Sequence, residues 1–197
     1  SSVVMMMITI VVCFCLCVDV AISKPIIPKK YPLFKQCDPS WGSHRMGGNE
    51  TRSNLCDRGC AMSGVTMALA GKGFTLSNGG GIDPDTFNEF LHSHNGYICI
   101  GSYCDNLRLE APEEVSPGNI KFLGEPQKPA AEELVRYLDQ QNPIVVAHVR
   151  ELKHFVLLIG YDDSNTTLFY CHDPYFETFS YDWIEFSDVL LYNMLQQ

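Results

Sequence analysis

Three side chains, Cys60, His154 and Asp173, have the types and the order along the chain that nucleophilic catalysis by a thiol requires. The thiol attacks as a thiolate, an imidazole holds that thiolate and later protonates the leaving group, and a third polar group orients the imidazole. Cys60 opens a run of small and apolar residues that predicts a helix ending near Gly71-Lys72-Gly73. A thiol in the first turn of a helix faces the positive end of the helix dipole, which favours the thiolate.

The imidazole and the carboxylate are expected on neighbouring strands. The sequence predicts three strands separated by polar turns, over residues 143–149, 154–161 and 167–171. Residues 162–165 suit a hairpin loop between the last two. His154 begins the second strand and Asp173 follows the third, so antiparallel pairing would bring the two side chains together.

Each of the three residues also has a purely structural interpretation. Cys60 could be half of a disulfide or a small core residue, and His154 could be a core histidine with satisfied hydrogen bonds. Asp173 could simply form a turn before Pro174. For any one of these residues, the structural interpretation is the commoner one. The occurrence of all three residues in the order of a catalytic set favours a catalytic role. A zinc site is less well supported, because Cys56-x-x-x-Cys60 has no matching His or Cys pair, and no cofactor or metal is expected.

The composition fits one folded domain that does not bind nucleic acid. Of the 197 residues, 46% are hydrophobic and 19% charged, and the net charge of −9 with scattered basic residues is unsuited to a phosphate backbone. Helices are also expected at residues 84–93, with Asp83 as N-cap, and at 129–141, and a short strand at 31–36. Helices come first and antiparallel strands later, which predicts an α+β fold with N-terminal helices packed on an antiparallel sheet.

The N-terminal residues predict a secretory leader. Residues 5–18 are almost wholly apolar, and the small residues of Ala21-Ile22-Ser23 suit cleavage after Ser23. The chain would then consist of a signal peptide over residues 1–23 and a domain over 24–197. A membrane span needs roughly 20 apolar residues. An uncleaved anchor is therefore the less favoured alternative, and no stable membrane insertion is expected after cleavage.

The cysteines and the glycosylation sequons also favour the secretory pathway. Three of the nine cysteines lie in the predicted leader, and an exported domain with the other six favours disulfides. We expect bridges Cys37–Cys56 and Cys99–Cys104, with Cys171 as a free thiol buried on a strand. The sequons Asn49-Glu50-Thr51 and Asn165-Thr166-Thr167 agree with a glycoprotein that is secreted or held in the endomembrane lumen.

Several short motifs follow one another in an order known from a peptidase family. They are Gln36-Cys37-Asp38-Pro39-Ser40-Trp41-Gly42, Gly59-Cys60-Ala61-Met62-Ser63 with its Ala-rich helix, the helix opened by Asp83-Pro84, Pro143-Ile144-Val145-Val146-Ala147, His154-Phe155-Val156 with Gly160-Tyr161-Asp162, and Asp173-Pro174. Over residues 31–181 the chain resembles a bacteriocin-processing-peptidase-like domain. These domains are papain-like cysteine peptidases related to the double-glycine leader peptidases.

The resemblance implies a papain-like fold and assigns roles to four residues. Cys60 would be the thiolate, His154 the general base and Asp173 the orienting carboxylate. Gln36 would supply its side-chain amide to an oxyanion hole beside the backbone N–H of Cys60. The alternative for Gln36 is a strand-end glutamine in a solvated turn.

Three functions remain open at this point. The first is a secreted cysteine hydrolase that cleaves peptide or related amide bonds through a covalent thioester. The second is a non-catalytic binding or structural module on the same fold, which a Cys56–Cys60 disulfide would produce. The third is an amidase or transpeptidase that uses the same triad on a non-protein substrate, because a thioester serves water or an amine equally.

Overall fold

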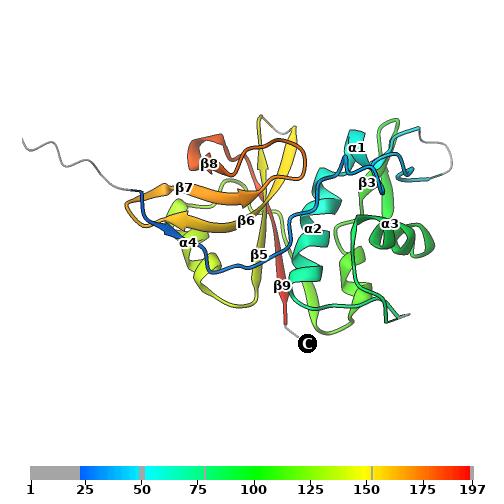
Figure 1. Ribbon diagram of the computed structural model, residues 1–197, viewed down its shortest axis with the longest axis horizontal. Helices are drawn as coiled ribbons and strands as arrows, with labels where there is room; N and C mark the ends of the chain where they lie inside the picture. Colours follow the sequence, from blue (N-terminus) through cyan, green and yellow to red (C-terminus); the bar gives the residue numbers. More distant parts are fainter. Residues whose placement is uncertain (1–22, 49–51, 78, 152, 196–197) are drawn as a thin grey trace, which may run out of the picture.

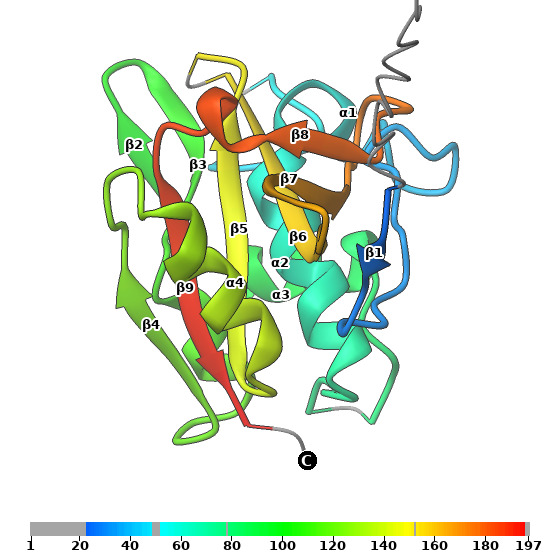
Figure 2. The same cartoon turned by 90° about the vertical axis from the view of Figure 1, so that its left-hand side faces the viewer.

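The computed structural model of the protein describes residues 23–48, 52–77, 79–151 and 153–195. Residues 1–22 of the expected leader and the sequon at Asn49 lie outside this described part. The fold is α+β, as predicted, with an antiparallel sheet between two layers of helix (Figures 1 and 2).

The described part of the chain contains a seven-stranded sheet in the order β4-β9-β5-β6-β7-β8, with β1 added to the end of β6. Its strands are β1 (Pro25–Ile26), β4 (Ile120–Gly124), β5 (Pro143–Val149), β6 (His154–Asp162), β7 (Asn165–His172), β8 (Ser180–Asp182) and β9 (Val189–Met194). Every pairing is antiparallel. The C-terminal strand β9 lies between β4 and β5, so the two ends of the domain are tied into one sheet.

The helices cover both faces of this sheet. The elements are α1 (Leu55–Arg58), α2 (Cys60–Gly71), α3 (Pro84–Ser93) and α4 (Ala131–Asp139), with 3₁₀ turns η1 (Ala111–Val115) and η2 (Trp183–Glu185) and a separate hairpin of β2 (Tyr97–Ile100) and β3 (Tyr103–Leu107). Helix α2 packs on one face of β5 and β6, with α3 outside it, and α4 packs on the other face (Figure 2). Strands β5 and β6 are therefore almost entirely buried, which explains their continuous Val, Ile and Leu runs.

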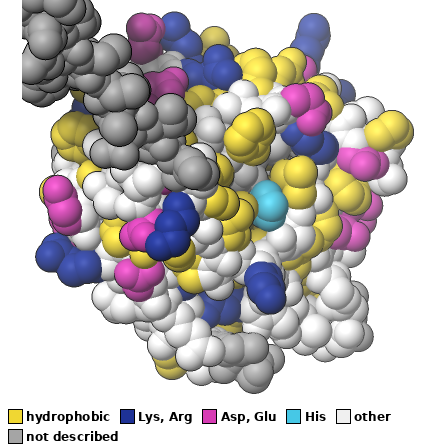
Figure 3. Space-filling view, turned by 60° about the vertical axis from the view of Figure 1, so that its left-hand side comes forward, with side chains coloured by type: hydrophobic (Ala, Val, Ile, Leu, Met, Phe, Trp, Pro, Cys, Tyr) yellow, Lys and Arg dark blue, Asp and Glu magenta, His cyan; other side chains and the backbone are white. Residues whose placement is uncertain are grey.

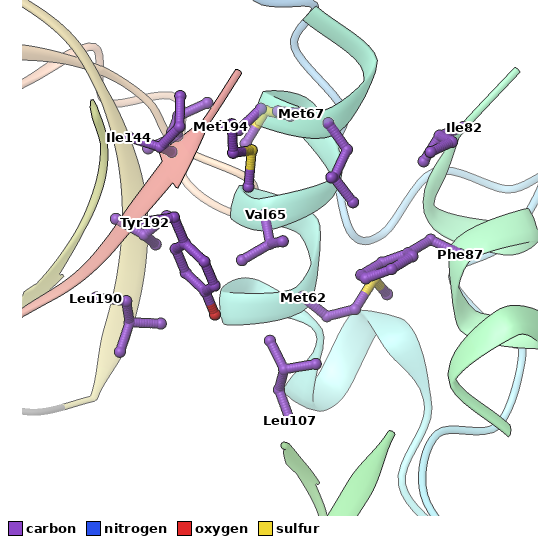
Figure 4. Packing of buried hydrophobic residues seen from close by; sticks show 14 of the residues in the cluster. Met62, Val65, Met67, Ile82, Phe87, Leu107, Ile144, Leu190, Tyr192 and Met194 are labelled. Atoms are coloured by element: carbon purple, nitrogen blue, oxygen red, sulfur yellow. The ribbon is translucent and has the colours of Figure 1, made fainter. Parts of the chain in front are cut away.

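Helix α2 is held rigidly because nearly all of its surface is buried. Met62 and Val65 pack between Tyr192 of β9 and Phe87 of α3, all of them at most 1% exposed (Figure 4). A side chain at Gly64 would meet Val146 of β5 at 3.1 Å, so the helix lies close against the sheet. This packing fixes the position of Cys60, the first residue of the helix.

The structure agrees with most of the predicted elements and corrects two of them. The helices at 60–71 and 84–93 form as expected, and Asp83 makes the capping box of α3. The helix expected over 129–141 is shorter, from Ala131 to Asp139. The strand expected over residues 31–36 is absent, because Pro32 lacks an N–H and the segment instead contacts the site through its end at Gln36.

Candidate active site

Cys60 lies where two helices meet almost end to end. Only Gly59 separates α1 from α2, and its N–H donates to the carbonyl of Leu55 at 2.8 Å. A Cβ at position 59 would lie 2.4 Å from that carbonyl oxygen, so only glycine permits this junction. The thiol of Cys60 is free and partly exposed at the N-terminus of α2. The first N–H groups of a helix have no partner within it, so they are available to an anion at this thiol.

His154 and Asp173 are in direct contact, as their predicted strands suggested. The imidazole Nε2 lies 2.7 Å from Oδ1 of Asp173, and both residues are buried. Strand pairing explains the contact: His172 pairs with Leu157, so Asp173 lies one step farther along, opposite Val156. His154 is on the same side of β6 as Val156 because side chains alternate along a strand. The Nδ1 atom is then the nitrogen left for Cys60, whose side chain is close enough to the imidazole to raise its pKa.

Burial and charge act in opposite directions on this pair. Burial lowers the pKa of His154, but the hydrogen bonds and charges of Asp173 and Cys60 outweigh it and raise the pKa to about 9. Burial raises the pKa of Asp173, whereas its hydrogen bond and ion pair with His154 hold that pKa below its usual value. The imidazole is therefore protonated, and the carboxylate ionised, at neutral pH.

Asp173 also organises the chain that follows it. Its Oδ1 accepts the backbone N–H groups of Tyr175 and Phe176, each at 2.8 Å, and its Oδ2 accepts the hydroxyl of Tyr181 at 2.8 Å. Arg150 Nε donates to the same hydroxyl at 3.0 Å. One carboxylate thus orients the imidazole and holds the backbone of Tyr175 and Phe176 beside it.

Gln36 reaches the same cavity as Cys60 and His154. It is 3% exposed, and its Nε2 donates to the carbonyl of Cys56 at 2.6 Å, while Oε1 has no hydrogen-bond partner among the described residues. An amide nitrogen carries two hydrogens, so a second N–H remains for a ligand. The neighbouring disulfide Cys37–Cys56 fastens this glutamine to the start of α1. Three of the four predicted site residues, Gln36, Cys60 and His154, thus line one cavity, and the buried Asp173 contacts His154 behind it.

That cavity has a volume of about 820 Å³ and contains side chains that the sequence analysis did not single out. Tyr175 and Phe176 form an aromatic wall edge-on to His154. The guanidinium of Arg150 lies over the ring of Phe176 at 3.9 Å. The only sequence signal for this wall is that the two aromatic residues follow Asp173-Pro174 directly. On the face in Figure 3, charged side chains of both signs are scattered among hydrophobic ones.

The disulfides agree with the predicted pairs. Cys37 bonds Cys56 and Cys99 bonds Cys104, which fits an oxidising compartment, and Cys60 and Cys171 are free. The Cys56–Cys60 bridge of the non-catalytic alternative is not formed, because Cys56 is already bonded to Cys37. Burial raises the pKa of Cys171 far above its ordinary value, which makes that thiol unreactive.

Comparison with known families gives a clear assignment, since residues 29–194 match the profile of the Peptidase_C39-like family. The chain belongs to this family. Membership agrees with a papain-like α+β fold, and it indicates a cysteine-peptidase type of function with peptide substrates. Searches of the curated proteins and of the solved structures found no match.

Two further searches concerned metals and membranes. Within the described ranges, no group of three or more His, Cys, Asp or Glu side chains is arranged to hold a metal ion. None of the helices in those ranges has the length and apolar character that crossing a bilayer requires.

Proposed function

We propose that the protein is a secreted cysteine peptidase that hydrolyses peptide bonds through a thioester on Cys60. The observation that carries this proposal is the contact between His154 Nε2 and Asp173 at 2.7 Å, beside a cavity that His154 shares with Cys60. A free thiol at a helix N-terminus, a protonated imidazole and a buried carboxylate provide the three groups that thiol catalysis needs.

Acylation follows from the protonation state of His154. The Cys60 thiolate attacks the carbonyl carbon, and its electron pair forms the C–S bond while the carbonyl oxygen becomes an oxyanion. That oxyanion accepts the backbone N–H of Cys60 and the spare amide N–H of Gln36. The imidazolium then gives its proton to the amide nitrogen, the C–N bond breaks, and the amine leaves with one new hydrogen.

Deacylation uses the same groups in reverse. His154, now neutral, takes a proton from water as the water oxygen attacks the thioester. The second tetrahedral intermediate collapses, the C–S bond breaks and the carboxylic acid is released. Cys60 is left as the thiolate beside the imidazolium, as at the start. Asp173 remains ionised throughout and holds Nε2, so that Nδ1 always faces the sulfur.

Secretion is part of the proposal. The leader over residues 1–23 would be removed, which would leave Lys24 at the start of the domain beside β1. Asn165 is exposed at the first residue of β7, so an oligosaccharide there would project into solvent. The two disulfides support the same route.

The test is peptide turnover by the oxidised protein, followed with a mixture of quenched fluorescent peptides. The wild type should cleave members of the mixture, and Cys60→Ala and His154→Ala should not, although their circular dichroism is unchanged. Cys171→Ser is the matched control, because it removes the other free thiol in the described ranges and should retain activity. Equal turnover by Cys60→Ala would overturn the proposal.

A further inference from the structure

Asp105 of β3 is a buried carboxylate without a hydrogen bond. Its side chain is 1% exposed, and neither oxygen accepts a hydrogen bond from the described residues. Among those residues it forms an ion pair with Nε of Arg58, at 3.5 Å. A buried charge in such surroundings is costly unless a charged partner with hydrogen-bonding groups satisfies it. The carboxylate therefore has unused capacity to bind a cation.

This carboxylate lines a cavity that reaches the proposed nucleophile. The cavity has a volume of about 430 Å³ and includes Cys60 and Ala61 from the start of α2. It is distinct from the larger cavity of Gln36 and the aromatic wall, and the two share Cys60, Asp57 and Lys153. A peptide held for attack by Cys60 would thus have a second cavity within reach of its side chains.

The position of Asp105 is fixed by its neighbours. The adjacent Cys104 is bonded to Cys99, and its carbonyl accepts the N–H of Gly48 at 3.2 Å. On the other side, Leu107 is buried in the core under α2. Since β3 is held at both of these points, the backbone that carries the carboxylate is fixed beside the cavity.

The other charged groups of this cavity do not fully satisfy Asp105, so a cation of a ligand can still bind it. Asp57 adds a second carboxylate, and His148 is already engaged with Asp188 at 3.2 Å. Arg58 is 44% exposed, and its guanidinium lies over the ring of Tyr103, so only one edge contacts Asp105. An incoming cation with several N–H groups can replace that contact with shorter hydrogen bonds.

Lys153 also lines the cavity, and it pairs with the exposed Glu151 at 3.5 Å. The cavity also has an apolar part, formed by Leu107, Met62 and Phe155. An acidic group beside apolar walls matches a long aliphatic stem that ends in a cation, which is the structure of a lysine or arginine side chain.

We propose that this cavity is a specificity subsite that binds a Lys or Arg side chain of the peptide substrate, close to the bond that is cleaved, through Asp105. The inference rests on the proposed peptidase function and names its substrate class. The same carboxylate could instead bind the free α-amino group of a short peptide, and the experiment separates these two sources of cation.

The test measures how fast peptidyl acyloxymethyl ketones modify Cys60, by mass spectrometry. Acetyl-capped probes carry either lysine or its uncharged isostere norleucine at the first, second or third residue before the ketone. At one of these positions the lysine probe should react about 10- to 100-fold faster, as expected for a buried hydrogen-bonded charge pair. Asp105→Asn should remove this preference, while Asp163→Asn, the same change at an exposed turn, should keep it.

Three outcomes decide the matter. Equal rates for lysine and norleucine probes at all three positions would overturn the proposed subsite. This comparison uses the wild type alone, so it does not depend on whether Asp105→Asn folds. Faster reaction of uncapped norleucine probes than of capped lysine probes would assign the carboxylate to an α-amino group and overturn the side-chain proposal. Iodoacetamide, which carries no peptide, tests the nucleophile separately: failure to modify Cys60 would refute the proposed function and not the subsite alone.

Discussion

Replacing Asp173 with asparagine should lower the pKa of His154 while leaving the imidazole in place. The amide oxygen can still accept the Nε2 hydrogen and the backbone N–H groups of Tyr175 and Phe176. The hydroxyl of Tyr181, now a donor to Oδ2, can turn to accept from the new amide. The substitution therefore removes one negative charge at 2.7 Å from Nε2 and little else.

The size of the effect follows from that distance. Opposite unit charges attract by about 4 kcal/mol even at a separation of about 4 Å and an effective dielectric constant of about 20, which sets the scale for this closer pair. An adjacent opposite charge typically shifts a pKa by about 1–3 units. Starting from about 9 in the wild type, the pKa of His154 should therefore fall by about 1–3 units in Asp173→Asn.

Proton NMR of the imidazole C–H signals against pH measures this directly. The His154 signal is assigned by its absence in His154→Gln. Asp188→Asn is the matched control, because it removes a carboxylate 3.2 Å from a different imidazole, that of His148, and should leave the His154 midpoint unchanged. A wild-type midpoint near 6.5, or a midpoint near 9 that persists in Asp173→Asn, would refute the electrostatic account of the pair.

Three further predictions concern stability and the N-terminal strand. The pKa of His154 rises from 6.5 to about 9 on folding, so its contribution to the free energy of unfolding should be complete below pH 6.5 and lost as the pH rises through 9. Urea titrations from pH 6 to 10 measure this dependence, and His154→Gln should flatten it. The double substitution Cys37→Ser with Cys56→Ser should lower the free energy of unfolding by about 3 kcal/mol, as expected for the loss of a bridge across 19 residues, whereas an unchanged urea midpoint would contradict it. A Cβ at Gly160 would lie 2.1 Å from the backbone of β1, so Gly160→Ala should speed amide hydrogen exchange at Ile26 and Ile27. Gly81→Ala is the control and should not, because a Cβ at that position meets nothing within 4 Å.

The sequence was most informative where local pattern and burial agree. The buried strands of residues 143–149 and 154–162 and the helix after Gly59 are continuous apolar runs bounded by turn residues, so their positions were predicted closely. Because His154 and Asp173 flank consecutive hairpin strands, their contact also followed from the chain order. The Cys99–Cys104 bridge was predicted because it closes a local loop, and the predicted second bridge, Cys37–Cys56, joins cysteines 19 residues apart.

The remaining features depend on contacts between distant segments. Strand β9 lies between β4 and β5, an order that no local pattern specifies. Asp105 gives no signal in the sequence, because its burial results from a hairpin packed against α2 and the site. The segment at residues 31–36 was predicted as a strand, but Pro32 lacks an N–H, and the N–H of Gln36 donates to the carbonyl of Pro174 instead of to a sheet partner.

The central claim is that His154 activates Cys60, and the rate of Cys60 alkylation by iodoacetamide at pH 6 tests it most directly. Cys171 is an internal reference in the same digest, because it is the other free cysteine of the described ranges and is buried. We predict that Cys60 reacts rapidly, that Cys171 does not, and that His154→Gln slows Cys60 about 100-fold or more, in the range attributed to acid–base assistance. Equal rates for Cys60 in the wild type and in His154→Gln would contradict the account.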